Sequence, residues 1–336
     1  MYNEQIKQAF IQKYTDSDKT KNLLLYIFRG ISEIEEKYGV DFCAMNQPQA
    51  QEAFNAVTGI RVNGANAILM ILKAYVRWCG TNGIPVSGAV QNLHIDVYDK
   101  LKCGYVSSPR HLLDTLDIVF PNPALNQIEY VYRTFFWLGF MGLQVSEAIQ
   151  VTEKDLDFKD RRLVFFDDQS KDASTEEVLP IYPESITDLR MAVELTEFRE
   201  ERRTKGVWKP RASGHEILRG KVSKKTLEES INATFRPTIS RAFKAALEGY
   251  EKRGEKVPEE FASKLTFKHV YMSGIYYREY KKEQAGISPD FDEVVLRERR
   301  NAKETTFSRN YTERKLINLL IREMEQDYEN WKSVFG

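Results

Sequence analysis

The sequence has no excess of charge of either sign. Its 336 residues include 49 Lys or Arg and 49 Asp or Glu, so the formal net charge is zero. A uniformly basic protein that holds nucleic acid by overall charge is therefore excluded, and any such surface must come from local clustering. The length allows two domains with separate cores.

Cysteine is scarce. Cys43, Cys79 and Cys103 form an odd set without Cys-x-x-Cys spacing. This pattern argues against a disulfide framework and against a zinc site, and it fits a reducing cytoplasm. We expect the three side chains to pack as small apolar groups.

Other features are missing as well. No apolar run approaches the roughly 18 residues that span a bilayer, and the polar start "MYNEQIKQAF" has no signal-peptide character. There is no Gly-rich phosphate loop and no metal-ligand spacing. We therefore expect a soluble, cytoplasmic protein with no membrane contact, no cofactor and no metal.

What the sequence does contain is helical periodicity. Apolar residues at helical spacing predict helices over residues 19–39, 47–59 and 63–83. Gly39 is a plausible stop for the first of them. Residues 84–107 are interpreted as a last helix and a linker. We expect a helical domain over 1–104 and a second domain over 105–336.

The second domain is predicted to be mixed. Ser108 and Pro109 are typical of a helix start, and an aromatic-rich helix should follow. Residues 161–181 predict a β-hairpin or three short strands around a polar turn. The predicted helices cover 107–120, 126–142, 186–206, 223–254 (two helices split near Pro237), 267–286 and 310–336. The expected class is mainly α with a small β-sheet.

The stretch "MGLQVSEAIQVTEKDLDF" joins a helix that stops at Gly142 to a second helix opened by Ser146 and Glu147. This layout and the order of elements resemble the tyrosine recombinase family, which includes the phage integrases. The resemblance covers nearly the whole chain at the level of pattern. It implies a helical core-binding domain followed by a mixed α/β catalytic-like domain, which together clamp double-stranded DNA.

In that family a tyrosine attacks a DNA phosphate and two arginines stabilise the charge of the transition state. In the family the first arginine belongs to a Gly-Leu-Arg-x-Ser-Glu box. The corresponding box of this sequence has Gln144 at the position of the arginine. An amide can form a hydrogen bond to phosphate, but it brings neither charge nor a bidentate guanidinium. The frame is thus kept while its catalytic residue is changed.

The second family box is His-x-x-Arg, and "LTFKHVYMSG" aligns with it in two ways. With His269 as the histidine, the arginine position holds Met272; with Lys268, it holds Tyr271. Both alignments lose the arginine. Instead of a catalytic role, His269 could serve as a capping or core histidine. Lys171 matches the family's hairpin lysine, and the alternative interpretation is a solvated side chain.

Tyr311 is the candidate nucleophile. The family's third His or Trp is expected about two to three helical turns upstream, where this chain has "RRNAKE". One missing transition-state donor costs about 2.7–4 kcal/mol, so the loss of both arginines predicts a degenerate site without strand cleavage. A structural role for Tyr311 is the alternative.

Positive charge gathers in the second domain. Residues 199–256 contain 16 Lys or Arg against 8 Glu and no Asp, a local excess of +8. Family helices of both domains contact DNA, and solvated helix faces are the alternative for each single residue. The predicted DNA-binding residues are Arg61, Asn63, Lys73, Arg77, Lys171, Arg211, Lys221, Lys224, Lys225, Arg236, Arg241, Lys244 and Lys268.

The apolar stripe of the C-terminal helix, from Leu316 to Tyr328, allows self-association, as in family members, or packing on its own domain. The leading hypothesis is a sequence-specific DNA-binding transcriptional repressor without recombinase activity. It resembles the lysogeny repressors of SPβ-type Bacillus phages. An active recombinase using Tyr311 and an accessory subunit of a recombinase are the alternatives.

Overall fold

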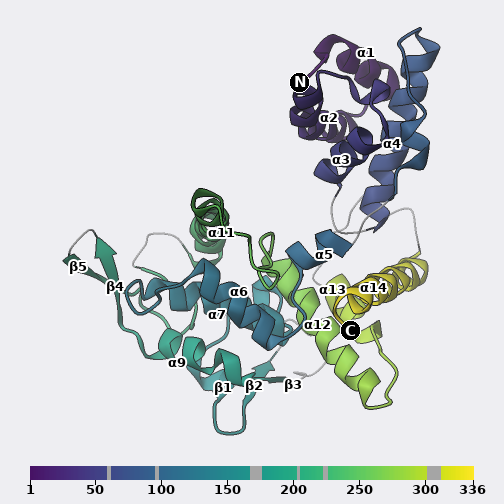
Figure 1. The fold of residues 1–336 in the computed structure, drawn as a ribbon. Coiled ribbons are helices and arrows are strands. Elements are labelled where there is room, and N and C mark those ends of the chain that lie inside the picture. Colours follow the sequence, from purple (N-terminus) through teal and green to yellow (C-terminus); the bar gives the residue numbers. More distant parts are fainter. Residues whose placement is uncertain (59–61, 95–97, 167–175, 203–204, 222–225, 301–311) are drawn as a thin grey trace. The chain divides into compact units, whose positions relative to one another are not determined.

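The computed structural model describes residues 1–336 except 59–61, 95–97, 167–175, 203–204, 222–225 and 301–311 (Figure 1). The chain divides into two compact units, Met1–Leu101 and Lys102–Gly336, and each is described by itself. Most described residues are helical and the strands are short, so the predicted class, mainly α with a small β-sheet, is confirmed.

The N-terminal unit is built from helices α1 (Glu4–Tyr14), α2 (Asp18–Tyr38), α3 (Gln47–Val57) and α4 (Val62–Thr81). Helix α2 ends where predicted, because Gly39 adopts a φ of 63° that favours glycine. The segment 84–107 differs from the prediction. It contains a 3-10 turn (Ala89–Asn92) and then helix α5 (Tyr98–Gly104), where a linker was expected.

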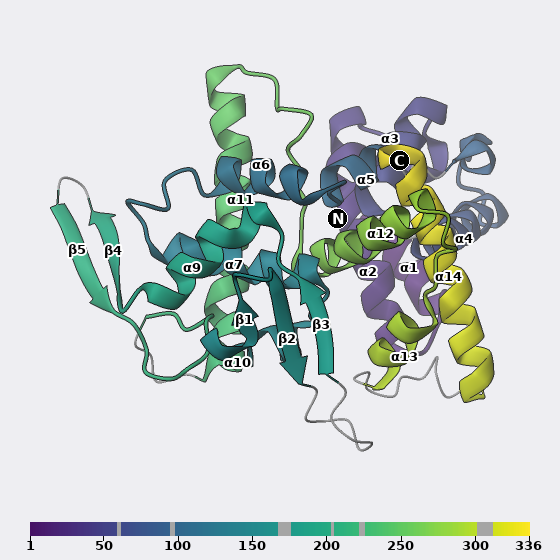
Figure 2. The ribbon, with the colours of Figure 1, turned by 90° about the horizontal axis from the view of Figure 1, so that it is seen from below.

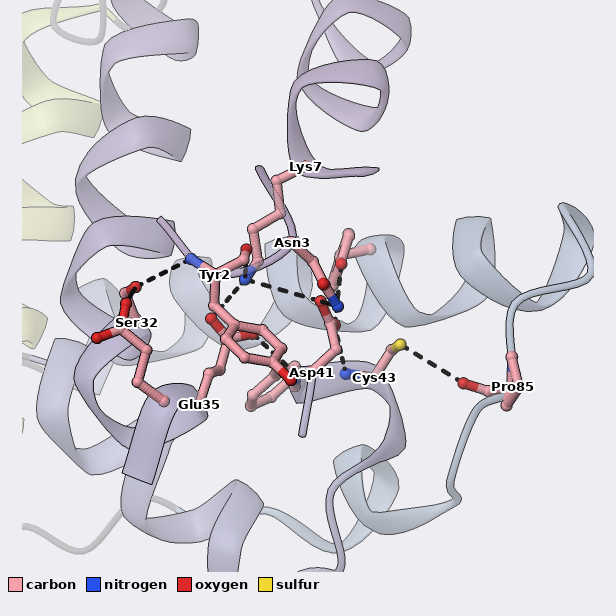
Figure 3. A network of polar contacts seen from close by, with 11 residues as sticks. Tyr2, Asn3, Lys7, Ser32, Glu35, Asp41, Cys43 and Pro85 are labelled. Carbon is pink, nitrogen blue, oxygen red and sulfur yellow. Dashed lines mark hydrogen bonds and ion pairs between the residues drawn. The ribbon is translucent and has the colours of Figure 1, made fainter. Parts of the chain in front are cut away.

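A buried ion cluster lies inside this unit, and Figure 3 shows its polar contacts. The Lys7 side chain is fully buried; its Nζ donates to Glu35 and to the Tyr2 carbonyl (2.8 Å) and lies 3.8 Å from Asp41 Oδ2. The Phe42 amide donates to Glu35 Oε1 (2.9 Å). Burial raises the pKa of Glu35 to about 7, although Lys7 opposes the shift.

The second unit is organised around three helices, α6 (Pro109–Val119), α7 (Ile128–Met141) and α12 (Phe267–Gln284). Ser108 caps α6 as predicted, because its Oγ accepts from the His111 amide (3.2 Å). Every residue of α7 from Val131 to Met141 is buried, so its aromatic side chains form the core.

Helices α7 and α12 touch through their backbones. A Cβ atom on Gly274 would lie 1.8 Å from the Phe140 carbonyl oxygen, so only glycine fits this crossing. Four residues further along α12, Arg278 Nη1 donates to the carbonyls of Phe140 (3.0 Å) and Met141 (2.9 Å). The open carbonyls at the end of α7 are thus satisfied by α12.

Strands β1 (Leu156–Asp157), β2 (Arg162–Phe166) and β3 (Glu176–Pro180) form an antiparallel sheet in sequential order (Figure 2). Leu163 pairs with Leu179 in the register, and both are buried. The strands predicted over 161–181 are confirmed. Residues 167–175 between β2 and β3, with Lys171, lie outside the described residues.

The single helix predicted over 186–206 is wrong. Helix α9 (Ile186–Glu194) is followed by the two-stranded hairpin β4 (Glu197–Arg202) and β5 (Lys205–Pro210). Phe198 and Glu200 are buried while Glu197 is exposed, a period of two that suits a strand. The Arg199 backbone also exchanges hydrogen bonds with Gln127, which ties β4 to the unit.

The split predicted near Pro237 takes the form of a π-helical turn between two α-helices. Helix α10 (Leu227–Ser230), a π-helical turn (Ile231–Phe235) and helix α11 (Arg236–Arg253) follow one another without a break. Pro237 lies in the first turn of α11. We attribute the wider π-helical turn to the proline, whose ring clashes with a carbonyl in ordinary α-helix and which donates no hydrogen bond.

Two helices complete the unit. Helix α13 (Asp292–Arg300) was not predicted, whereas α14 (Glu313–Phe335) confirms the predicted C-terminal helix. The apolar stripe of α14 packs on its own unit: Trp331 and Tyr328 are buried, and Trp331 Nε1 donates to the Val106 carbonyl (3.2 Å). Tyr311 lies outside the described residues.

Candidate nucleic-acid interface

A surface pocket of about 380 Å³ is lined by Gln144 and by other residues that the family resemblance assigns to the site, and we call it the Gln144 pocket. The loop after α7 forms one wall and the start of α12 forms another, with α11 and α13 contributing the rest. Its lining residues are Gln144, Val145, Arg236, Phe267, Lys268, Tyr271 and Glu298.

The loop wall is held by local backbone geometry. Helix α7 ends at Gly142, whose φ of 113° favours glycine, and helix α8 (Val145–Ala148) begins three residues later. The Gln144 amide donates to Glu147 Oε2 (2.6 Å), which caps α8. Gln144 therefore occupies a fixed position at a helix start, where its side chain lines the pocket.

The α12 wall of the pocket holds the two residues of one of the alignments of the second family box. Thr266 caps α12 by accepting from the His269 amide (3.3 Å), and Lys268 and Tyr271, three residues apart, both line the pocket. His269 instead stacks on Tyr105 with ring centroids 5.0 Å apart, and Met272 is buried. The structure thus places Lys268 and Tyr271, not His269 and Met272, beside Gln144.

Gln144 and Tyr271 bring neutral groups to the pocket. Burial raises the pKa of Tyr271, which keeps its hydroxyl protonated, and this hydroxyl interacts with the Gln144 side chain. The cations of the pocket are Arg236 and Lys268, and Glu298 is the acidic residue among its described lining. Such a pocket can attract a phosphate, but it cannot supply the two guanidinium groups of the family's chemistry.

A further guanidinium contacts Glu147, the residue that caps α8 at the loop wall. Arg297 on α13 donates to Glu147 through Nε (2.9 Å) and Nη2 (2.8 Å), and to Glu177 through Nη1 (2.7 Å). We call these three residues the Arg297 cluster. Its donors point to carboxylates, so it shapes the loop and β3 around the pocket. The sequence interpretation missed it because it missed α13.

The predicted DNA-binding residues of α11 are exposed. Arg236, Arg241 and Lys244 lie on the helix surface, and Lys244 is 3.7 Å from Glu248. Arg236 also reaches the Gln144 pocket, together with Lys268 at the start of α12. The exposed cations of α11 therefore continue the positive side of the pocket.

Arg211 does not have the predicted exposure. It is buried and donates to backbone carbonyls of Leu195 (2.8 Å), Ile217 (2.6 Å), Val193 and Arg219. Its guanidinium is thereby committed to folding the segment after β5. Lys221 forms an ion pair with Glu200, and burial lowers its pKa. Lys224 and Lys225 lie outside the described residues.

In the N-terminal unit, Lys73 and Arg77 are four residues apart on one face of α4, and the exposed Met70 precedes them by one turn. Arg77 is exposed and Lys73 is half-buried. The placement of Arg61 and of the Asn63 side chain is outside the described part of the chain.

Comparison with known proteins gives two findings. Residues 1–81 match a family model described as MrpR, N-terminal core-binding domain. Solved structures of the Tn1549 transposon integrase also match, one in complex with circular intermediate DNA and one, a variant, with transposon right end DNA.

The first complex is 13% identical over 91% of this chain and 97% of that chain, with a TM-score of 0.29; the second is 13% identical over 94% and 98%, also with a TM-score of 0.29. No curated protein matches. In the described ranges no helix meets the requirements for crossing a membrane, and no group of three or more His, Cys, Asp or Glu is placed to hold a metal ion.

Proposed function

We propose that this chain binds specific sites on double-stranded DNA without cleaving them, and that it acts as a transcriptional repressor. The observation that carries the proposal is the Gln144 pocket. A neutral amide and a protonated phenol stand where strand transfer needs two guanidinium groups, while Arg236 and Lys268 remain on its lining.

Two further observations support DNA binding. The match of residues 1–81 to a core-binding domain supports an N-terminal unit that holds one side of a duplex, with Lys73 and Arg77 on α4 toward phosphates. The cations of α11 supply a second set of phosphate contacts. Because phosphate contacts release counterions, this binding should depend strongly on salt.

Site-specific binding is tested by retaining sheared genomic DNA on the purified chain at about 0.15 M salt, where weak surface electrostatics is screened. Half of the sample is treated with denaturing detergent before recovery. We expect discrete fragments that detach in detergent. Unselective retention contradicts site-specific binding.

Loss of cleavage is tested on a retained site that carries a nick, which traps any covalent protein–DNA adduct. The wild type and Tyr311→Phe should both leave no detergent-resistant adduct, while an active tyrosine recombinase on its own nicked site serves as the positive control. An adduct that the wild type forms and Tyr311→Phe does not would show an active recombinase and overturn the proposal.

The repressor role is tested by placing a retained fragment at a reporter promoter. Wild-type chain should lower transcription, and the Arg236→Ala/Lys268→Ala variant should lower it much less. Tight DNA binding that appears only with an added recombinase would instead identify an accessory subunit.

A further inference from the structure

A second hollow of the second unit lies beside the Gln144 pocket, between α11 and the start of α12, and we call it the α11 groove. Its volume is about 630 Å³, within the range of small-molecule sites. The apolar side chains that line it are Phe135, Phe136, Ile239, Phe243, Leu247, Leu265 and Phe267.

The rim of the groove is cationic. Arg236, Lys244, Lys264 and Lys268 line it, and no Asp or Glu of the described residues does. The start of α12 contributes as well, since Thr266 caps this 18-residue helix at the groove and a helix start favours negative charge. An apolar floor with cations along its edge is complementary to a molecule with an apolar body and one anionic group.

We propose that the α11 groove binds a small amphipathic anion, a carboxylate on an acyl or aromatic body, and that this ligand releases the protein from DNA. The apolar body lies against Phe243 and Leu265, and the carboxylate pairs with the rim cations. The proposal has two halves: binding of the anion in the groove, and release of DNA by the bound anion. The second, regulatory half rests on the proposed function, and the binding half does not.

The reason for the coupling is that two cations belong to both sites. Arg236 and Lys268 line the α11 groove and the Gln144 pocket alike. A carboxylate held by them competes with a DNA phosphate for the same donors. Ligand and DNA should therefore lower one another's affinity by the same factor.

Binding is measured first without DNA, by isothermal titration calorimetry with dodecanoate below its micelle concentration. We expect one saturable site, and no binding of dodecyltrimethylammonium, whose charge is reversed. Lys264→Glu, at the rim, and Leu247→Gln, at the floor, should each weaken dodecanoate binding at least tenfold. Lys281→Glu, on the exposed far end of α12, is the matched control and should leave it unchanged.

Three outcomes would overturn the binding half: no saturable binding, equal binding of the cationic detergent, or binding that the groove variants leave intact. A groove that refuses dodecanoate but binds an acidic amphipathic model peptide would show that the class of occupant is wrong. Both measurements need no operator, so they are independent of the proposed function.

Release is then measured by titrating dodecanoate into a preformed complex with a retained fragment. Wild-type chain should leave the DNA, and the Leu247→Gln complex should need at least tenfold more dodecanoate. Dodecanoate that binds the groove without displacing DNA would overturn the regulatory half alone. Absence of any DNA complex would instead contradict the proposed function.

Discussion

Each unit holds a cation between carboxylates, but the Lys7 cluster and the Arg297 cluster differ in what surrounds them. In the N-terminal unit Lys7 is fully enclosed with Glu35 and Asp41. In the second unit the Arg297 side chain is 15% exposed and its partner Glu177 is 39% exposed. The Lys7 cluster stabilises the interior of its unit. The Arg297 cluster borders the Gln144 pocket, because the Gln144 backbone amide donates to Glu147.

The Lys7 cluster therefore has a structural role, whereas the Arg297 cluster also shapes a binding pocket. An enclosed cation compensates for the burial of its partners, and a ligand cannot reach it. A cation at the edge of a pocket can still organise that pocket while its donors are occupied by carboxylates. The donors of Arg297 are therefore occupied by carboxylates, although its cluster borders the Gln144 pocket.

The largest effects should come from removing the central cation of either cluster. Lys7→Met and Arg297→Met each leave a buried carboxylate without its partner, which costs about 3–5 kcal/mol of unfolding free energy. Urea unfolding of the full chain checks this. Lys13→Met, at the exposed end of α1, is the control and should have little effect. Equal stability of Lys7→Met and Lys13→Met would show that the enclosed cluster contributes nothing.

The enclosed cluster should also show itself in the pH dependence of stability. The pKa of Glu35 is raised from 4.5 to about 7 in the folded chain, so the folded state binds a proton that the unfolded state releases. Its contribution, of the order of 3 kcal/mol, is present below about pH 4.5 and is lost as the pH rises through about 7.

This pH dependence is measured by urea unfolding between pH 4.5 and 8. Glu35→Gln should remove the loss of stability across the window, whatever its effect on stability at one pH. Glu52→Gln, which alters an exposed partner of Lys37, is the control and should keep the slope. An unchanged slope in Glu35→Gln would contradict the shifted pKa.

Removing a cation that lines the Gln144 pocket should lower the affinity for DNA and change the free energy of unfolding little. Arg236→Ala or Lys268→Ala should each weaken binding to a retained site by about ten- to hundredfold, since a charged hydrogen bond contributes roughly 1.5–3 kcal/mol. The slope of log affinity against log salt should also fall by about one for each phosphate that the variant no longer neutralises. Lys281→Ala is the control for charge alone.

The smallest effect should come from the pocket hydroxyl. Tyr271→Phe removes the interaction with Gln144 at a cost of about 1 kcal/mol of stability. DNA affinity should not change, because this hydroxyl contacts the Gln144 side chain in the pocket wall and is not expected to contact a phosphate. Tyr280→Phe on the same helix is the matched control. A clear loss of DNA affinity in Tyr271→Phe would assign the hydroxyl to the DNA contact.

Local patterns predicted most of the helices and the β2–β3 pairing. Ser108 and Gly39 marked helix ends because capping depends on only a few neighbouring residues. The strand β4 was missed because "EFREER" suits a helix by propensity, whereas its pairing with β5, the packing of Phe198 and the bonds to Gln127 favour a strand.

The candidate site was less predictable. Lys268 and His269 are neighbours in sequence, so choosing between them requires knowing which face of α12 meets the core. The burial of Arg211 and the contact of Arg297 with Glu147, 150 residues away, leave no local pattern at all. Charge counts treat every arginine alike, whereas tertiary contacts decide which can meet a phosphate.

The glycine contact between α7 and α12 has a consequence for the kinetics of binding. Because Gly274 brings α12 against Phe140, the walls that carry Gln144 and Lys268 cannot separate without breaking this helix pair. The Gln144 pocket is therefore preorganised, and an anion that enters it immobilises little further chain. The association rate constant of an anion at this pocket should therefore be set by diffusional encounter. It should fall as ionic strength rises, and no slow rearrangement of these two walls should limit it.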